Sequence, residues 1–170
     1  FDYLSVKNTA NALFYFAIGL PAFSIIKIFS SFLFARHNTK IPFYFSVISV
    51  IINIIISVYY FNKIGFIIIP MATTISSWLN SVLLLIYLTN KKYYSINSIF
   101  LYSLIKISLS TAITSYIFYN LIKFFSDNLS YNSEYKLVSI ILLVIVTIII
   151  YILTSILTKA FKISDIKLKY

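Results

Sequence analysis

The sequence predicts an all-α, polytopic membrane protein with five transmembrane helices. Two observations support this: the 170 residues are 61% hydrophobic with only 11% charged, and the apolar residues fall into long runs. Soluble domains are about 45–50% apolar and about 25% charged. A bilayer core of about 30 Å needs roughly 20 apolar residues per helix. Five stretches meet this length and leave no room for a soluble domain: residues 8–35, 42–61, 66–89, 98–124 and 137–158.

The connections between these stretches contain residues that end or begin helices. Pro42 suits the first turn of a helix, where its missing N–H costs no hydrogen bond. We expect a turn at residues 62–65, an end of the third stretch at Asn90, and a polar loop at residues 126–136. The Ile- and Val-rich run 140–150 is longer than the usual strand of 4–8 residues, which favours a helix there.

The first stretch contains an internal interruption. Gly19 and Pro21 lie in its middle, and a proline inside a helix removes one backbone hydrogen bond and kinks the helix. We therefore predict a hinge at Gly19 and Pro21. Pro70 lies within the first two turns of the third stretch, where it only reshapes the helix entrance.

Lysine and arginine residues near the ends of the stretches predict the orientation in the membrane. The side richer in these residues is cytoplasmic. One side has eight of them (Arg36, Lys40, Lys91, Lys92, Lys159, Lys162, Lys167 and Lys169) and the other has four (Lys7, Lys63, Lys123 and Lys136). We therefore expect the first stretch to enter from outside and the C-terminus to be cytoplasmic. The first residue is Phe1 and not Met, and no charged segment precedes the first apolar run, so we expect no signal peptide and a chain that begins within a longer protein.

Polar residues inside the stretches recur every three or four positions, which places each set on one helix face. We call these sets the polar stripes: Ser24, Lys27 and Ser31; Ser46, Ser49, Asn53 and Ser57; Thr73, Ser77 and Asn80; Ser103, Lys106, Ser110 and Thr114. One interpretation is helix packing, because small hydroxyl residues let helices approach and hydrogen-bond. The other is a polar cavity between the helices.

Lys27 is the most informative of these residues. It lies nine residues before Arg36, and therefore about 13 Å deeper in the membrane. A charge near the midplane costs at least about 2.5 kcal/mol, and such residues usually face a cavity or a partner. Lys106 lies nearer a helix end, where its long side chain can reach the head groups. Arg36 and Lys40 flank a short loop that is either a cytoplasmic anchor or a phosphate or gate contact.

The sequence offers little for catalysis, so we expect no enzyme, no cofactor and no metal site. It has no cysteine, a single histidine (His37) and four acidic residues. Nucleotide-binding loops, zinc-binding helices and catalytic triads have no matching motif. The net charge of +10 is spread between the apolar runs, which favours lipid head groups and argues against nucleic acid as a partner.

One segment resembles a known family. Gly-Leu-Pro-Ala-Phe at residues 19–23, Lys27, and Phe-Ala-Arg-His-Asn-Thr-Lys-Ile-Pro at residues 34–42 are similar to a pattern of the MurJ/MviN lipid II flippases, members of the MOP exporter superfamily in the bacterial inner membrane. Trp78-Leu79-Asn80 also fits that family. The resemblance is clear over residues 1–92, although Asn38 replaces the usual acidic residue.

The resemblance implies a fold and a division of the chain. Family members have fourteen transmembrane helices, of which these five would be the tenth to fourteenth. Residues 1–92 would then be the C-terminal part of the second transmembrane lobe, with three spans. Residues 93–170 would be the additional C-terminal helix pair and a short cytoplasmic tail. The missing N-terminal part of the same transporter would be a partner of this chain.

The resemblance also implies a function: translocation of lipid II, the undecaprenyl-linked peptidoglycan precursor, by alternating access. The expected site residues are Lys27, Ser24, Ser31, Asn53 and Asn80 in a substrate cavity, Gly19 and Pro21 at the hinge, Arg36 and Lys40 at a cytoplasmic gate, and Lys106, Ser110 and Thr147 in a lipid-tail groove. The alternatives are a flippase for another lipid-linked oligosaccharide, such as an O-antigen or teichoic precursor, and a non-transporting membrane subunit or gene remnant.

Overall fold

A computed structural model describes residues 3–95, 97–130 and 135–160, and within them it is all-helical. The elements are α1 (Tyr3–Ala35), α2 (Lys40–Ile64), the 3-10 helix η1 (Gly65–Ile67), α3 (Ile68–Asn90), α4 (Ser98–Phe124) and α5 (Lys136–Leu157). The tail beyond residue 160, with three of the lysines used to predict orientation, lies outside the described residues.

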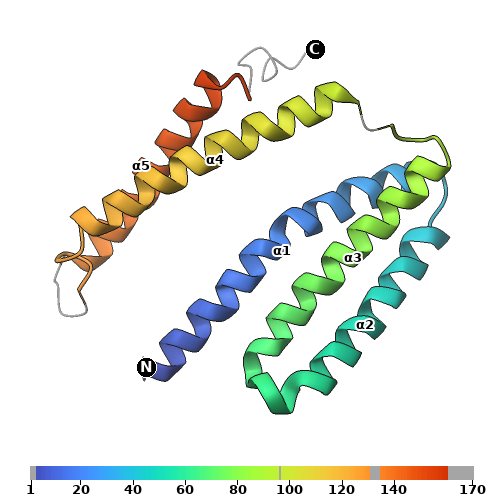
Figure 1. The fold of residues 1–170 in the computed structure, drawn as a ribbon, viewed down its shortest axis with the longest axis horizontal. Helices are drawn as coiled ribbons and strands as arrows, with labels where there is room; N and C mark the ends of the chain where they lie inside the picture. The colour runs from blue at the N-terminus through green and yellow to red at the C-terminus, as the bar shows by residue number, and fades with distance from the viewer. Residues whose placement is uncertain (1–2, 96, 131–134, 161–170) are drawn as a thin grey trace. The chain divides into compact units, whose positions relative to one another are not determined.

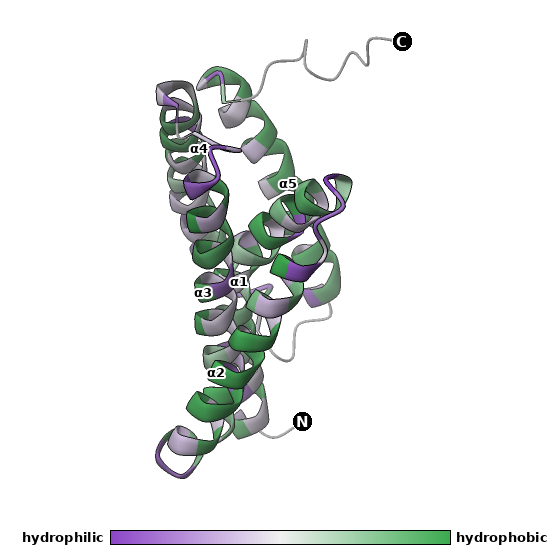
Figure 2. Cartoon of the chain, turned by 90° about the vertical axis from the view of Figure 1, so that its right-hand side faces the viewer, coloured by the Kyte–Doolittle hydropathy of each residue, from purple (hydrophilic) through white to green (hydrophobic). Residues whose placement is uncertain are grey.

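The described helices are long and apolar enough to cross a membrane. Four such stretches are present: Tyr3–Ala35, Lys40–Asn90, Phe100–Phe124 and Lys136–Leu157. The second has 51 residues and contains both α2 and α3, because only η1 separates them. The chain reverses direction at η1, so α2 and α3 lie antiparallel (Figure 1). Hydrophobic residues cover the helices, and hydrophilic residues gather mainly at their ends (Figure 2).

The chain forms two compact units, Phe1–Ser95 and Ile96–Tyr170, which we call unit 1 and unit 2. In unit 1, α3 is the central helix: both α1 and α2 pack along it, whereas they contact each other only sparsely (Figure 1). In unit 2, α4 packs against α5. The assignment of residues 1–92 and 93–170 to parts of a transporter stays a prediction.

Three helices end with the same hydrogen-bonded motif, in which the residue after the helix has a positive φ angle. At the end of α1, the N–H of Asn38 donates to the carbonyl of Leu33, and that of His37 to Phe34, both at 2.9 Å. His37, Lys92 and Lys159 have φ angles of 58°, 56° and 53°. Basic side chains suit these ends because the last carbonyls of a helix carry partial negative charge.

Two sequence expectations about turns meet different outcomes. The chain turns later than the expected residues 62–65, since residues 62–64 still belong to α2 and the helix is capped by Gly65, whose φ angle is +74°. The interruption of the first helix is not present: α1 continues from Tyr3 to Ala35 with Pro21 inside it. Neighbouring side chains of α3 bond to α1 just before the proline, as described below. Bending at this position stays a prediction.

Candidate functional site: a polar groove in unit 1

The loop ends of α1, α2 and α3 are fixed by apolar and aromatic contacts. Leu33, Leu84 and Leu88 are almost fully buried and form a small core between α1 and α3. Tyr87 of α3 stacks edge-on against Phe45 of α2 with ring centroids 6.2 Å apart. These contacts hold the three helices together at one end and so define where the space between α1 and α2 begins.

Arg36 belongs to the same end of unit 1. Its guanidinium carbon lies 4.8 Å from the centre of the Phe32 ring and 4.2 Å from that of Tyr93. An arginine over an aromatic ring is attracted by the negative face of the ring. The sequence presented Arg36 as an anchor or a gate; in the structure it links the end of α1 to the residues after α3.

Nearer the N-terminal ends of both helices, side chains of α3 bond directly to the backbone of α1. The hydroxyl of Thr74 donates to the carbonyl of Tyr15 at 2.6 Å, and the indole N–H of Trp78 donates to the carbonyl of Ile18 at 3.2 Å. Gly19 directly follows Ile18 and is buried. A Cβ atom on Gly19 would be 3.1 Å from the Thr74 hydroxyl, so glycine is what permits this close approach.

Asn53 connects α2 to α3. Its amide nitrogen lies 3.1 Å from the Thr73 hydroxyl and 3.3 Å from the Ser76 hydroxyl, and donates to both. Its carbonyl oxygen accepts a bond from Ser57 at 3.4 Å. Inside a membrane an amide needs such partners because lipid provides none. Asn53 therefore packs α2 on α3 through a polar side chain.

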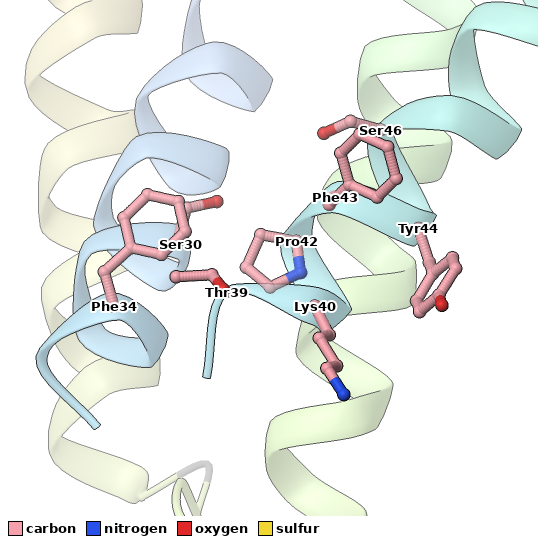
Figure 3. A pocket seen from close by; sticks show the side chains of 8 residues that line it. All are labelled: Ser30, Phe34, Thr39, Lys40, Pro42, Phe43, Tyr44 and Ser46. Atoms are coloured by element: carbon pink, nitrogen blue, oxygen red, sulfur yellow. The ribbon is translucent and has the colours of Figure 1, made fainter. Parts of the chain in front are cut away.

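Because α1 and α2 both pack on α3 and diverge from each other, a groove runs between them. Its outer part, near the loop, has a volume of about 590 Å³ and is lined by Ser30, Phe34, Thr39, Lys40, Pro42, Phe43, Tyr44 and Ser46. Ser30 and Phe34 on α1 face Pro42 across the gap (Figure 3). The Lys40 ammonium group extends past the beginning of α2, at the mouth of the groove (Figure 3).

The inner part of the groove has a volume of about 370 Å³ and shares Ser46 with the outer part. Its polar lining comes from the stripes of α2 and α3: Ser46, Ser49, Asn53, Thr73, Ser76, Ser77 and Asn80. Phe23 and Ile26 contribute the α1 side. Asn80 is only 6% exposed, and its side-chain oxygen has no hydrogen-bond partner in the described part of the chain.

The structure brings together only part of the expected cavity. Asn53 and Asn80 line the same groove, whereas Ser24, Lys27 and Ser31 are exposed on α1 and are not among the lining residues. The expected hinge residues also separate, since Gly19 is buried against α3 and Pro21 is exposed. A repeat of three and four residues places side chains on one face but does not say which neighbour that face meets.

In unit 2 the fourth polar stripe packs against α5. Ser110 bonds to Thr158 at 2.7 Å, and Thr114 to Thr154 at 3.1 Å. Thr147 lines a shallow, mainly apolar cavity of about 320 Å³ with Thr111, Thr114, Ser115, Phe118, Ile148 and Tyr151. Ser110 is fully buried and Lys106 is half-buried, and neither lines this cavity. The three residues expected in a lipid-tail groove therefore do not share one.

Thr74 and Trp78 contact α1, which the sequence pattern does not predict. They are four residues apart, so both project from one face of α3. The residues of the polar stripe on α3 project from a neighbouring face. The partners of Thr74 and Trp78 are backbone carbonyls, which every residue has. For that reason, no pattern in the sequence of α1 could have identified these two bonds.

Five apolar helices with polar residues on their packing faces define the class of protein: an integral, multi-pass membrane protein. Comparison with known proteins specifies it further. The family model described as lipid II flippase MurJ matches residues 1–140. The chain therefore belongs to the MurJ family, which is a family of membrane transporters.

Individual relatives agree with this assignment. The chain is 37% identical over 84 residues to a probable lipid II flippase MurJ of Rickettsia prowazekii, which is 49% of this chain and 17% of the relative. It is 36% identical over 69 residues to the probable lipid II flippase MurJ of Rhizobium meliloti, covering 41% of this chain and 13% of the relative. The matched segments are thus a small part of these longer proteins. No solved structure matches the chain significantly.

Proposed function

We propose that the chain forms part of a transporter that moves lipid II across the bacterial inner membrane by alternating access. The family match over residues 1–140 carries this proposal. The relatives named as probable lipid II flippases support the same substrate. The transported precursor, the surrounding bilayer and further helices of the transporter are then the partners of this chain.

The proposed orientation places the C-terminus in the cytoplasm. His37, Lys92 and Lys159 follow the ends of α1, α3 and α5, which are the ends predicted to be cytoplasmic. The positive charges of Lys92 and Lys159, with those of Arg36 and Lys91, agree with the bias of cytoplasmic loops.

The proposed role of Lys27 is to hold the pyrophosphate of the precursor from a water-filled cavity. Lys27 is exposed on unit 1, on a face with Ser24 and Ser31. A cation at this depth is unstable against lipid tails, so this face needs polar surroundings. We assign the same face, together with the mouth at Lys40, to the substrate side of the transporter. Bending of α1 at Pro21 would accompany the change of access.

Complementation tests this proposal. The 84 residues that match the Rickettsia prowazekii relative would be exchanged for those of this chain, and the chimera expressed in bacteria depleted of their own lipid II flippase. We expect growth and normal cell shape, and loss of both for Lys27→Ala but not for Lys91→Gln. A chimera that is inserted in the membrane, fails to support growth and supports O-antigen export instead would favour the other flippase class.

A further inference from the structure

Asn80 is a buried residue of the inner groove whose side-chain oxygen is left unsatisfied by the described residues. The residue is only 6% exposed. A buried acceptor without a donor costs free energy, and in a membrane lipid tails supply no donor. A group that enters the groove and donates a hydrogen bond to Asn80 would remove this cost.

The lining indicates the chemistry of that group. Among the described residues, the lining of the inner groove combines hydroxyl and amide side chains with Phe23, Ile26, Val50 and Ile54 and has no charged side chain, so it suits an uncharged ligand with polar and apolar sides. The outer groove adds the aromatic residues Phe34, Phe43 and Tyr44, with Lys40 at the mouth. Aromatic faces and hydroxyl groups suit the two sides of a sugar, and a lysine suits a phosphate.

We propose that the groove between α1 and α2 binds the sugar and amide portion of a lipid-linked head group, with its phosphate at Lys40 and a hydroxyl or amide N–H donating to Asn80. This proposal rests on the proposed function, since it takes the same lipid-linked substrate. It adds a second site to the face of Lys27: the groove takes the uncharged portion of the substrate, and Lys40 takes a phosphate at its mouth.

The length of the groove agrees with an extended head group. Lys40 and Asn53 are thirteen residues apart on α2, which corresponds to about 20 Å along a helix. Ser46 lies between them and belongs to both parts of the groove. A chain of several sugar or amino-acid units can occupy this length, whereas a single phosphate cannot.

The binding of two lipids that share a tail and a pyrophosphate tests this site independently of the rest of the protein. The purified chain would be placed in lipid nanodiscs and titrated with lipid II and with undecaprenyl pyrophosphate, which lacks the sugar and peptide. Asn80→Leu keeps the size of the side chain and removes the acceptor. We expect it to weaken lipid II binding about fivefold, the equivalent of one lost hydrogen bond, and to leave undecaprenyl pyrophosphate binding unchanged.

A second variant changes an exposed residue of the groove instead of a buried one. Ser46 is exposed, so Ser46→Leu should fold while blocking the passage between the two parts of the groove. We expect the same selective loss of lipid II binding. Lys40→Gln should weaken both lipids, whereas Lys91→Gln, an exposed lysine outside the groove, should weaken neither. Ser155→Ala is the control for Asn80, because Ser155 has the other buried oxygen without a partner among the described residues.

The outcomes distinguish this site from the proposed function. Suppose that the unaltered chain binds lipid II, and that Asn80→Leu and Ser46→Leu bind it as well as the unaltered chain does. The groove is then not a head-group site, and a packing helix is its occupant. Equal losses for both lipids would also overturn the proposal. If the unaltered chain binds lipid II no better than an ordinary phospholipid, the proposed function fails as well.

Discussion

Unit 1 and unit 2 use polar residues differently to hold helices together. In unit 1 a small leucine core, aromatic pairs and hydrogen bonds to backbone carbonyls surround one central helix. In unit 2 the described buried residues are five hydroxyl residues and one leucine: Ser110, Thr114, Ser139, Thr154, Ser155 and Leu143. The apolar side chains of α5 are mostly exposed.

The difference follows from the solvent. In a bilayer, burying a leucine against another helix gains little, since lipid tails are equally apolar. Two helices therefore meet through small hydroxyl residues, as α4 and α5 do. A third helix changes this balance, because α3 has neighbours on two sides and so can place bulkier residues and amides between them. The groove of unit 1 is a consequence of this three-helix arrangement.

The largest expected effect is on the close approach of α1 and α3. Gly19→Leu would push a side chain into Thr74 and break its bond to Tyr15. Overpacking of this kind costs about 1–3 kcal/mol, and we expect the upper end of that range. The measurement is unfolding in mixed micelles followed by the fluorescence of Trp78, the single tryptophan, which reports on unit 1.

Gly65→Ala is the control for this substitution. Nothing lies within 4 Å of a Cβ atom at Gly65, so the cost is limited to backbone strain at φ +74° and ψ −152°, a conformation almost restricted to glycine that costs about 1–3 kcal/mol. Equal losses for the two variants would show that the contact with Thr74 does not determine the packing of α1 on α3.

The polar connection between α2 and α3 is expected to be weaker than that contact. Asn53→Ala removes the bonds to Thr73 and Ser76, and we expect a loss of about 1–2 kcal/mol on the scale of hydrogen bonds between membrane helices. The same fluorescence measurement applies. Ser24→Ala is the matched control, because the Ser24 hydroxyl bonds only within its own helix, to Leu20. A loss as large for Ser24→Ala would argue against a special role for Asn53.

The hydroxyl pairs of unit 2 should each contribute less. A double-mutant cycle of Thr114→Val and Thr154→Val isolates their bond, and we expect a coupling of about 0.6 kcal/mol. Circular dichroism gives the unfolding curve of all the helices, and Trp78 fluorescence identifies the part of that curve that belongs to unit 1. A coupling near zero would mean that shape, not hydrogen bonding, holds α4 to α5.

The smallest expected effect concerns Arg36. Arg36→Gln removes its attraction to Phe32 and Tyr93, which for an exposed pair is about 0.5–1 kcal/mol. We expect the lower end, measured by Trp78 fluorescence. Tyr93→Leu leaves the contact of Arg36 with Phe32 and should give a smaller loss, and combining the two substitutions should cost no more than Arg36→Gln alone. Additive losses would show that the guanidinium and this ring act independently.

By itself, the sequence determined the five helices, the tight turn at Gly65 and the family. The bilayer is the physical reason, because it requires every backbone group to be bonded within its own helix and fixes the length of each span. A local pattern therefore suffices for these features. Three other features depend on how the helices pack and not on a local pattern: the side that Lys27 faces, the partners of Asn53 and the burial of Gly19.

Only the tertiary structure decided which helices are neighbours. It placed α3 between α1 and α2, joined the stripes of α2 and α3 in one groove, and left Lys27 outside it. A polar stripe fixes the direction of its side chains around one helix axis, but its partner depends on how the other helices pack. The same stripe can therefore serve as a packing seam, as at Ser110 and Thr114, or as the wall of a groove, as at Asn80.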